Sequence, residues 1–200
     1  MKSFRYALCG LSLVLLFPAA ASSEPVGAKS VQLSKVVLDT ETSEVSARVK
    51  GGTLCVFPGN VKIPKEKKTQ DYERFDNLFS AELKSGGFNV ISTSSEMFGD
   101  EDDKNKADYL VGVTLRPETI NLCSSVKGEK GDISLIAEWQ VYDRAAGKIV
   151  ETVTTTGHGV QAKFAADGEK QMINNAFAAN LSSLLQRGVL QKYVSAAAAQ

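Results

Sequence analysis

The chain has 200 residues, of which 23 are basic and 23 acidic, and 43% of its residues are hydrophobic. This length and apolar content are those of one globular domain with an ordinary core. The balanced charge argues against a nucleic-acid-binding protein and against attachment to anionic lipid by charge alone.

Residues 1–21 predict a secretory signal peptide. Lys2 and Arg5 precede an apolar run from Ala7 to Phe17, and Pro18-Ala19-Ala20-Ala21 supplies small residues for cleavage. The apolar run is shorter than the roughly 20 residues that a membrane-spanning helix needs. The mature chain is therefore expected to be periplasmic or secreted, with no transmembrane segment.

Two cysteines remain after the predicted cleavage, because Cys9 lies within the signal peptide. Cys55 and Cys123 form an even pair in an oxidising compartment, where a disulfide is the expected state. A reactive thiol is the alternative, but no histidine lies near either cysteine in the sequence. Closing so long a loop is expected to stabilise the fold by roughly 4 kcal/mol in the chain-entropy model.

The first part of the mature chain is polar. Residues 22–50 predict a polar N-terminal segment with a possible edge strand at Val31–Leu38, ahead of a single domain over 51–194. Glycines precede the apolar run Thr53–Phe57 and Pro58-Gly59 follows it, a pattern typical of a short buried strand. The stretch Lys62–Lys68 is expected to be a basic loop.

The next elements are a helix and two strands. Apolar residues recur at helical spacing over Thr69–Ser85, with Thr69 as the expected N-cap and Gly86-Gly87 as the stop. Strands are predicted at Phe88–Ser92 and Tyr109–Leu115. Between them, the acids Asp100–Asp103 are interpreted as a solvated loop, because consecutive acids point in different directions and do not match a calcium loop.

The clearest pattern is a hairpin followed by a helix. Ile133–Tyr142 alternates apolar and polar residues, and Ile149–Thr156 returns as a β-branched strand that is expected to end at Gly157-His158-Gly159. The parity places Trp139 in the core and Tyr142 on the opposite face. A long amphipathic helix is predicted from about Met172 to Gly188, before a flexible tail at 195–200. The expected fold is an α+β domain: a mostly antiparallel sheet of about five strands, with two helices packed on one face.

The sequence contains no convincing catalytic or metal-binding set. His158 is the one histidine and lies between glycines, while zinc would need more ligands than one histidine and two distant cysteines provide. Glu138, on the polar face of the Trp139 strand, is the carboxylate that an alternative function, a secreted hydrolase, would use. A small-ligand carrier would need a cavity between sheet and helices. The large residues Phe75, Phe79, Trp139 and Phe177 favour a filled core instead.

Several segments between Gly51 and Leu190 together resemble small bacterial envelope domains. They are Cys55–Pro58 after a glycine pair, Glu82–Ile91, Ala107–Gly112, Glu138–Asp143 and Gly147–Val150. The chain resembles accessory domains of the TolB N-terminal or anticodon-binding-like fold, and outer-membrane lipoproteins that activate penicillin-binding proteins are similar in outline. This chain departs from those lipoproteins by lacking a lipidation signal. The resemblance implies no catalytic residue.

The predicted function is a non-catalytic accessory or binding module of the bacterial periplasm or cell envelope. It would act through protein–protein contacts with an unidentified envelope protein, without a cofactor and without nucleic acid. The possible partner-binding residues are Glu138, Gln140 and Tyr142 on the polar sheet face and Lys65 in the basic loop. The oligomeric state stays open.

Overall fold

The computed structural model describes residues 29–42, 44–59, 62–70, 72–92 and 107–194. The predicted signal peptide, the acidic run Asp100–Asp103 and the tail at 195–200 lie outside these residues. Among the described residues, no helix combines the length and the hydropathy of a membrane span.

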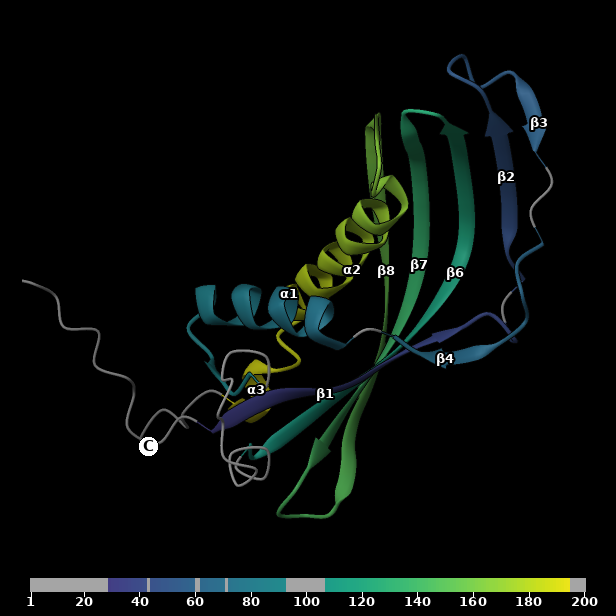
Figure 1. Cartoon of the computed structure of the whole chain (residues 1–200). Helices are drawn as coiled ribbons and strands as arrows, with labels where there is room; N and C mark the ends of the chain where they lie inside the picture. Colours follow the sequence, from purple (N-terminus) through teal and green to yellow (C-terminus); the bar gives the residue numbers. More distant parts are fainter. Residues whose placement is uncertain (1–28, 43, 60–61, 71, 93–106, 195–200) are drawn as a thin grey trace, which may run out of the picture.

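Within the described residues, one mixed sheet of eight strands carries three helices. The strands are β1 (Ser30–Asp39), β2 (Ser46–Gly51), β3 (Phe57–Gly59), β4 (Lys67–Thr69), β5 (Asn89–Val90), β6 (Tyr109–Ser125), β7 (Gly128–Asp143) and β8 (Lys148–Ala165). The helices are α1 (Tyr72–Ser85), α2 (Gly168–Gln186) and α3 (Gln191–Val194). A long, curved antiparallel meander of β6, β7 and β8 forms the frame of the molecule (Figure 1).

Strand β6 is bordered on one side by two different parallel strands. Its first half, Tyr109–Leu115, pairs with β1, and its second half, Thr119–Ser124, pairs with β2. Pro117 lies between the two halves, at a register shift in the β6–β7 ladder. Proline has no N–H to donate, so it is tolerated where neither parallel neighbour continues. The strand predicted at Tyr109–Leu115 therefore extends well beyond that proline.

The predicted fold class is wrong in its sheet: the sheet is mixed rather than mostly antiparallel, and it has eight strands among the described residues rather than about five. The predicted edge strand at Val31–Leu38 is an interior strand, because β1 pairs with β6 on one side and with β4 and β5 on the other. A β-bulge after Leu33 shifts the alternation by one residue, so Val31, Leu33 and Val36 are all fully buried. That slip weakens the period-2 signal on which the sequence prediction depended.

The prediction of a buried strand at Thr53–Phe57 is also wrong. Residues 52–55 form a turn, and the short strand β3 that follows is exposed. Gly52 adopts a φ of 83°, which lets the chain reverse onto β2 directly after the strand ends. Leu54 and Phe57 consequently keep 80% and 67% of their surface exposed.

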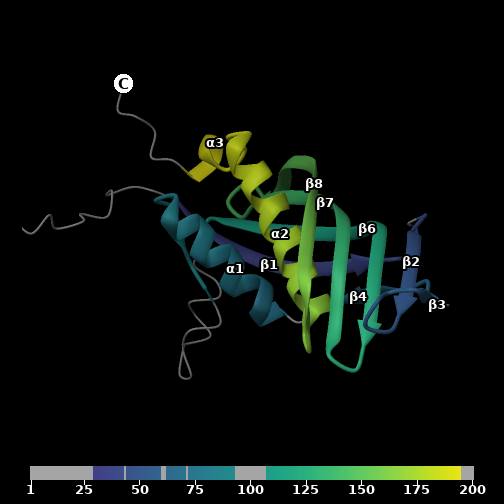
Figure 2. The ribbon, with the colours of Figure 1, turned by 90° about the horizontal axis from the view of Figure 1, so that it is seen from above.

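The core lies between the sheet and the helices α1 and α2, which cover one face, called here the inner face (Figure 2). Trp139 is fully buried there, as predicted, and its ring centroid is 5.6 Å from that of Phe177. The indole N–H of Trp139 donates to Thr155 Oγ1 (2.8 Å), which donates to Asn180 Oδ1 (2.6 Å). The Asn180 amide nitrogen in turn donates to the carbonyl of Leu135. This buried chain of hydrogen bonds fastens α2 to β7 and β8.

Helix α2 lies directly on the backbone of β8. The strand does not end at Gly157-His158-Gly159 as predicted, but continues to Ala165. A Cβ atom at Gly157 would lie 2.2 Å from the Ala176 carbonyl oxygen, and one at Gly159 would lie 1.9 Å from that of Met172. The two glycines therefore allow α2 to pack directly on β8, at one side of the inner face.

Side chains from the helical layer also bind the outer edge of β8. The Tyr193 hydroxyl donates to the Glu151 carboxylate (2.8 Å), and Arg187 Nη1 donates to the carbonyl of Thr154 (2.8 Å). Further along, Asn175 Nδ2 donates to the carbonyl of Val160 (3.1 Å). Two carbonyls and one carboxylate of this edge strand thus have partners from the helical layer.

Candidate functional site: an apolar groove on the inner face

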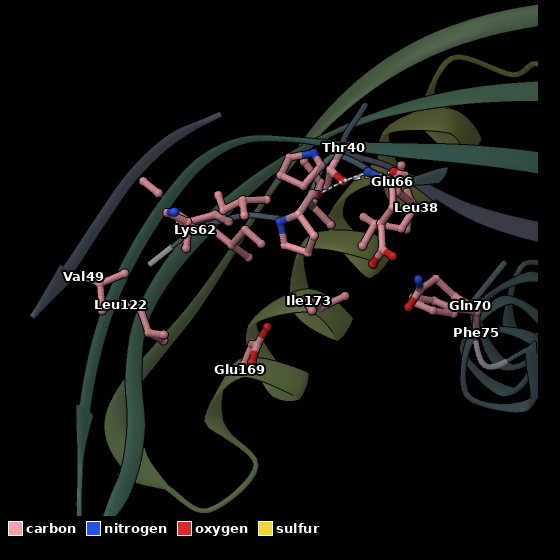
Figure 3. Close-up of a pocket in the computed structure, with 18 residues that line it drawn as sticks. Leu38, Thr40, Val49, Lys62, Glu66, Gln70, Phe75, Leu122, Glu169 and Ile173 are labelled. Atoms are coloured by element: carbon pink, nitrogen blue, oxygen red, sulfur yellow. Dashed lines mark hydrogen bonds between the residues drawn. The ribbon is translucent and has the colours of Figure 1, made fainter. Parts of the chain in front are cut away.

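A groove of about 370 Å³ opens on the inner face of the sheet, beside the helices (Figure 3). In that view Val49 and Leu122 lie at one end, Phe75 and Gln70 lie at the other, and Ile173 of α2 lies between them. The lining is predominantly apolar and comes from β1, β2, β6, β7, α1, α2 and the segment 62–66. Cavities of this size and composition are typical of binding sites for apolar groups.

The floor of the groove follows from the alternation of three strands. Ile120 of β6 pairs with Ile133 of β7, and Leu122 of β6 pairs with Val49 of β2. Alternate residues of a strand share a face, so Ile133 points to the same side as Trp139. The floor is therefore a continuation of the core face beside α2, on the side of β6 and β2.

The segment 62–66 forms the roof, and Thr40 at the end of β1 holds it in place. The Thr40 hydroxyl lies 2.6 Å from the Pro64 carbonyl and accepts a hydrogen bond from the Glu66 N–H at 3.0 Å. The backbone N–H of Thr40 donates to the Glu66 carbonyl at 2.9 Å. The predicted basic loop is thus attached to the sheet in its second half, and Lys67 begins strand β4.

Asp39 fixes the turn that presents Thr40. This carboxylate is buried, and it accepts hydrogen bonds from the N–H groups of Glu41 and Thr42 and from the Thr42 hydroxyl, at 2.9–3.2 Å. Burial by itself would raise the pKa of Asp39, but the hydrogen bonds together outweigh it and hold the pKa below its usual value. The charged form is thus the one that the fold requires.

Asp39→Asn is expected to lower the free energy of unfolding by about 1.5 kcal/mol at neutral pH, because an amide nitrogen cannot accept these hydrogen bonds. The folded-state pKa lies below that of an unfolded aspartate, about 3.9, so the contribution is complete above that pH. It is lost as the pH falls through the folded-state pKa. Urea denaturation from pH 7 to pH 3 should show wild type and variant converging on acidification. Glu82→Gln, at an exposed carboxylate of α1, is the control and should leave stability unchanged.

The rim of the groove carries charges of both signs. Lys62 is the cation among the described lining residues, and Glu66 and Glu169 are the carboxylates, with the Gln70 amide beside them. The sequence argument for a filled core does not extend to this groove. Phe75, Phe79, Phe177 and Trp139 are fully buried as predicted, but a cavity remains beside them, and Phe75 itself lines it together with Ile173 of α2.

The predicted partner-binding residues do not form one surface. Glu138, Gln140 and Tyr142 alternate with Trp139 and therefore lie on the outer face, opposite the groove. Glu138 forms an ion pair with Arg116 (3.2 Å) and accepts a hydrogen bond from Gln140 (3.3 Å). Lys65 is exposed in the roof segment of the groove, on the other side of the sheet. Whether the outer-face residues bind a partner stays a prediction.

The residues of the hydrolase alternative are also separated. His158 Nδ1 lies 3.1 Å from the Ser134 hydroxyl on the exposed outer face, whereas Glu138 is four residues further along β7, roughly 13 Å away. No cluster of three metal-ligating side chains occurs in the part of the chain that the structure describes.

Cys55 and Cys123 form a disulfide that joins the β2–β3 turn to β6, with a Cα–Cα distance of 5.6 Å. The bond links two segments that are 68 residues apart in the sequence.

The residues that line the groove were not singled out from the sequence. Ile63, Ile173 and Val49 come from three segments whose juxtaposition depends on the mixed topology. The strands predicted from the sequence were short, so no sequence signal indicated an uncovered part of the inner face.

Several solved structures are similar to this chain, all at low sequence identity. No family model and no curated protein matches the chain. It is similar to a hypothetical protein from Chlamydia trachomatis, at a TM-score of 0.44 and 13% identity over 85% of this chain and 99% of that one. A minor lipoprotein from Acinetobacter baumannii gives 0.38 and 11%, over 85% of this chain and 98% of the other. The LpoB C-terminal domain from Salmonella enterica gives 0.27 and 15%, over 67% and 86%.

At these TM-scores and identities, the likeness establishes neither a shared family nor a shared function. The fold and the groove define a class, a mixed-sheet domain with helices on one face and an apolar groove on that face. The resemblance to the TolB N-terminal fold stays a prediction.

Proposed function

We propose that this chain is a non-catalytic module of the bacterial envelope that binds an apolar peptide segment of another envelope protein in its groove. The predicted signal peptide supports export. The Cys55–Cys123 disulfide supports it independently, because such bonds persist in oxidising compartments. The separation of His158 from Glu138 supports a binding role rather than a hydrolytic one.

The observation that carries this proposal is the combination of an apolar floor with a rim of mixed charge. An anionic lipid headgroup would meet Glu66 and Glu169 beside Lys62, an unfavourable balance. A peptide offers apolar side chains for the floor and uncharged backbone amides for Gln70 and the carboxylates. The volume of about 370 Å³ accommodates a few apolar side chains rather than a complete helix.

Selection from a displayed library of random peptides tests the proposal with the purified mature protein. Enriched peptides should carry a short apolar run. Ile173→Trp fills the groove from α2, and Val49→Trp fills it from β2. Each should weaken binding of a selected peptide by about tenfold or more, which corresponds to about 1.4 kcal/mol. Isothermal titration calorimetry gives the dissociation constants, and thermal unfolding verifies that each variant is folded.

Tyr142→Ala is the matched control on the outer face and should leave peptide affinity unchanged. A loss with Tyr142→Ala and none with the two tryptophan variants would place the binding surface on the outer face instead. Selection of no peptide at all, or of peptides without apolar residues, would contradict the proposal.

A further inference from the structure

The far end of the sheet exposes four apolar side chains on two neighbouring turns. Leu54 lies in the β2–β3 turn, Val56 follows it and Phe57 begins β3, while Val126 lies in the turn between β6 and β7, at the same end of the sheet (Figure 1). Their exposed fractions are 80%, 62%, 67% and 99%. These four residues are called the apolar tip. Single exposed apolar residues are ordinary, but a group of them at one protruding end indicates a contact surface.

The tip is held outward by covalent and local structure. The disulfide fastens Cys55, in the middle of the β2–β3 turn, to Cys123 of β6. The N–H of Gly52 donates to the Ser124 carbonyl at 3.0 Å, which aligns the two turns. The φ of 56° at Cys55 is one that L-residues rarely adopt outside such fixed turns. The β2–β3 turn is therefore fixed beside the end of β6.

Cations lie near the tip on the outer face of the sheet, whereas Phe57, the partner of Gly51, lies on the inner face. Lys50 of β2 and Lys130 of β7 both pair with Cys123 across the strands, so they share the outer face, and Arg48 lies two residues before Lys50. Lys127 is exposed in the same turn as Val126. Arg48, Lys50 and Lys130 line a shallow polar pocket, whose one carboxylate, Asp132, accepts a hydrogen bond from Asn121 at 2.9 Å.

We infer that the apolar tip inserts into the interface of an anionic lipid bilayer, with Arg48, Lys50, Lys127 and Lys130 on the headgroups. A protruding tip suits a deformable bilayer, whereas a protein that covered it would need a complementary cavity. Apolar side chains at the interface with cations near them are the arrangement by which peripheral proteins bind anionic membranes. The net charge of the chain gave no sign of this, because the cations are concentrated locally. The site is separate from the groove, so it does not depend on the proposed function.

Tryptophan fluorescence tests insertion directly. The chain has a single tryptophan, Trp139, which is fully buried. Phe57→Trp therefore places a second fluorophore at the tip. Vesicles of phosphatidylcholine mixed with phosphatidylglycerol should shift its emission to the blue, and brominated lipid should quench it. Ile149→Trp, at a half-exposed position beside the opposite end of β7 and β8, should show neither effect. Equal responses from both variants, or none from Phe57→Trp, would overturn the inference.

Cosedimentation with the same vesicles measures how much the side chains of the apolar tip contribute to membrane binding. Leu54→Ser/Phe57→Ser should reduce the bound fraction by about tenfold or more, because each change removes apolar area from the bilayer. The matched control, Ile149→Ser/Tyr142→Ser, removes one aliphatic and one aromatic residue at the other end of the sheet and should bind as wild type. Equal binding by the tip variant and wild type would exclude the tip as the anchor.

Charge-reversal variants test whether binding to anionic vesicles requires the cations near the tip. Lys50→Glu/Lys127→Glu should abolish the preference for phosphatidylglycerol over pure phosphatidylcholine, whereas Lys84→Glu/Lys148→Glu, at exposed lysines elsewhere, should retain it. The groove variant Ile173→Trp should bind vesicles normally, which separates this site from the peptide site. If the wild-type protein does not bind vesicles, and the tip variants differ from it in oligomeric state, the tip is a protein contact and the inference fails.

Discussion

Replacing Cys55 and Cys123 together with serine is expected to lower the free energy of unfolding by about 4 kcal/mol. The disulfide closes a loop of 68 residues, and in the chain-entropy model a cross-link of that span restricts the unfolded chain by this amount. For a domain whose total stability is about 5–15 kcal/mol, such a loss is severe. Urea denaturation monitored by circular dichroism gives the difference.

Wild type treated with a thiol-free reductant is the control for the serine substitutions, because it removes the bond without changing a residue. It should unfold at the same urea concentration as the double variant. A loss below about 1 kcal/mol in both would show that the disulfide contributes local order at the β2–β3 turn rather than global stability.

Gly159→Ala is expected to lower the free energy of unfolding by about 3 kcal/mol. The added methyl group would lie 1.9 Å from the Met172 carbonyl oxygen, which belongs to the helix backbone and cannot move without the helix. Overpacking of this kind forces backbone shifts. Because Ile173 follows Met172 on α2, the displacement should also change the groove and weaken the selected peptide. Thermal unfolding and calorimetry measure the two effects.

Gly112→Ala provides the matched comparison on β6, since a methyl group there would have no heavy atom within 4 Å. Its effect on stability should stay within about 0.5 kcal/mol. Similar losses in both variants would mean that glycine acts through backbone flexibility in the strands, rather than by admitting α2.

The hairpin and the core anchor could be predicted because their signals are local. The alternation over Ile133–Tyr142 fixed the inner face of β7, and Trp139 is fully buried on it. Tyr142 is partly exposed, as that parity requires. The helix ending at Ser85 was also found, although α1 begins at Tyr72 and Thr69 belongs to β4 instead of capping the helix.

The mixed topology could not be predicted in this way. The pairing of β1 and β2 with successive halves of β6 joins residues about 70–80 positions apart, and no local pattern records it. The bulge in β1 also interrupts the alternation that would have indicated a buried strand. At Thr53–Phe57 the local pattern was misleading, because an apolar run beside glycines looks the same whether it enters the core or forms an exposed turn.

The groove results from the width of the sheet rather than from the length of its strands. Helix α2 runs along β8, and its first residue, Gly168, lies against Glu129 near the start of β7, so the helix does not stop short of the groove. The inner face continues sideways from α2 onto β6 and β2, where Leu122 and Val49 line the groove. The sequence contains these apolar residues, but no local pattern records the pairing of β2 with β6 that places them beside the helix.

The hydrogen bonds from Arg187 and Asn175 to the carbonyls of Thr154 and Val160 have a consequence for self-association. An exposed edge strand offers its unpaired backbone groups to a strand of another chain. A second chain that paired with β8 would first have to displace these two side chains from their acceptors. The side chains of the helical layer thereby oppose edge-to-edge pairing at these two positions of β8.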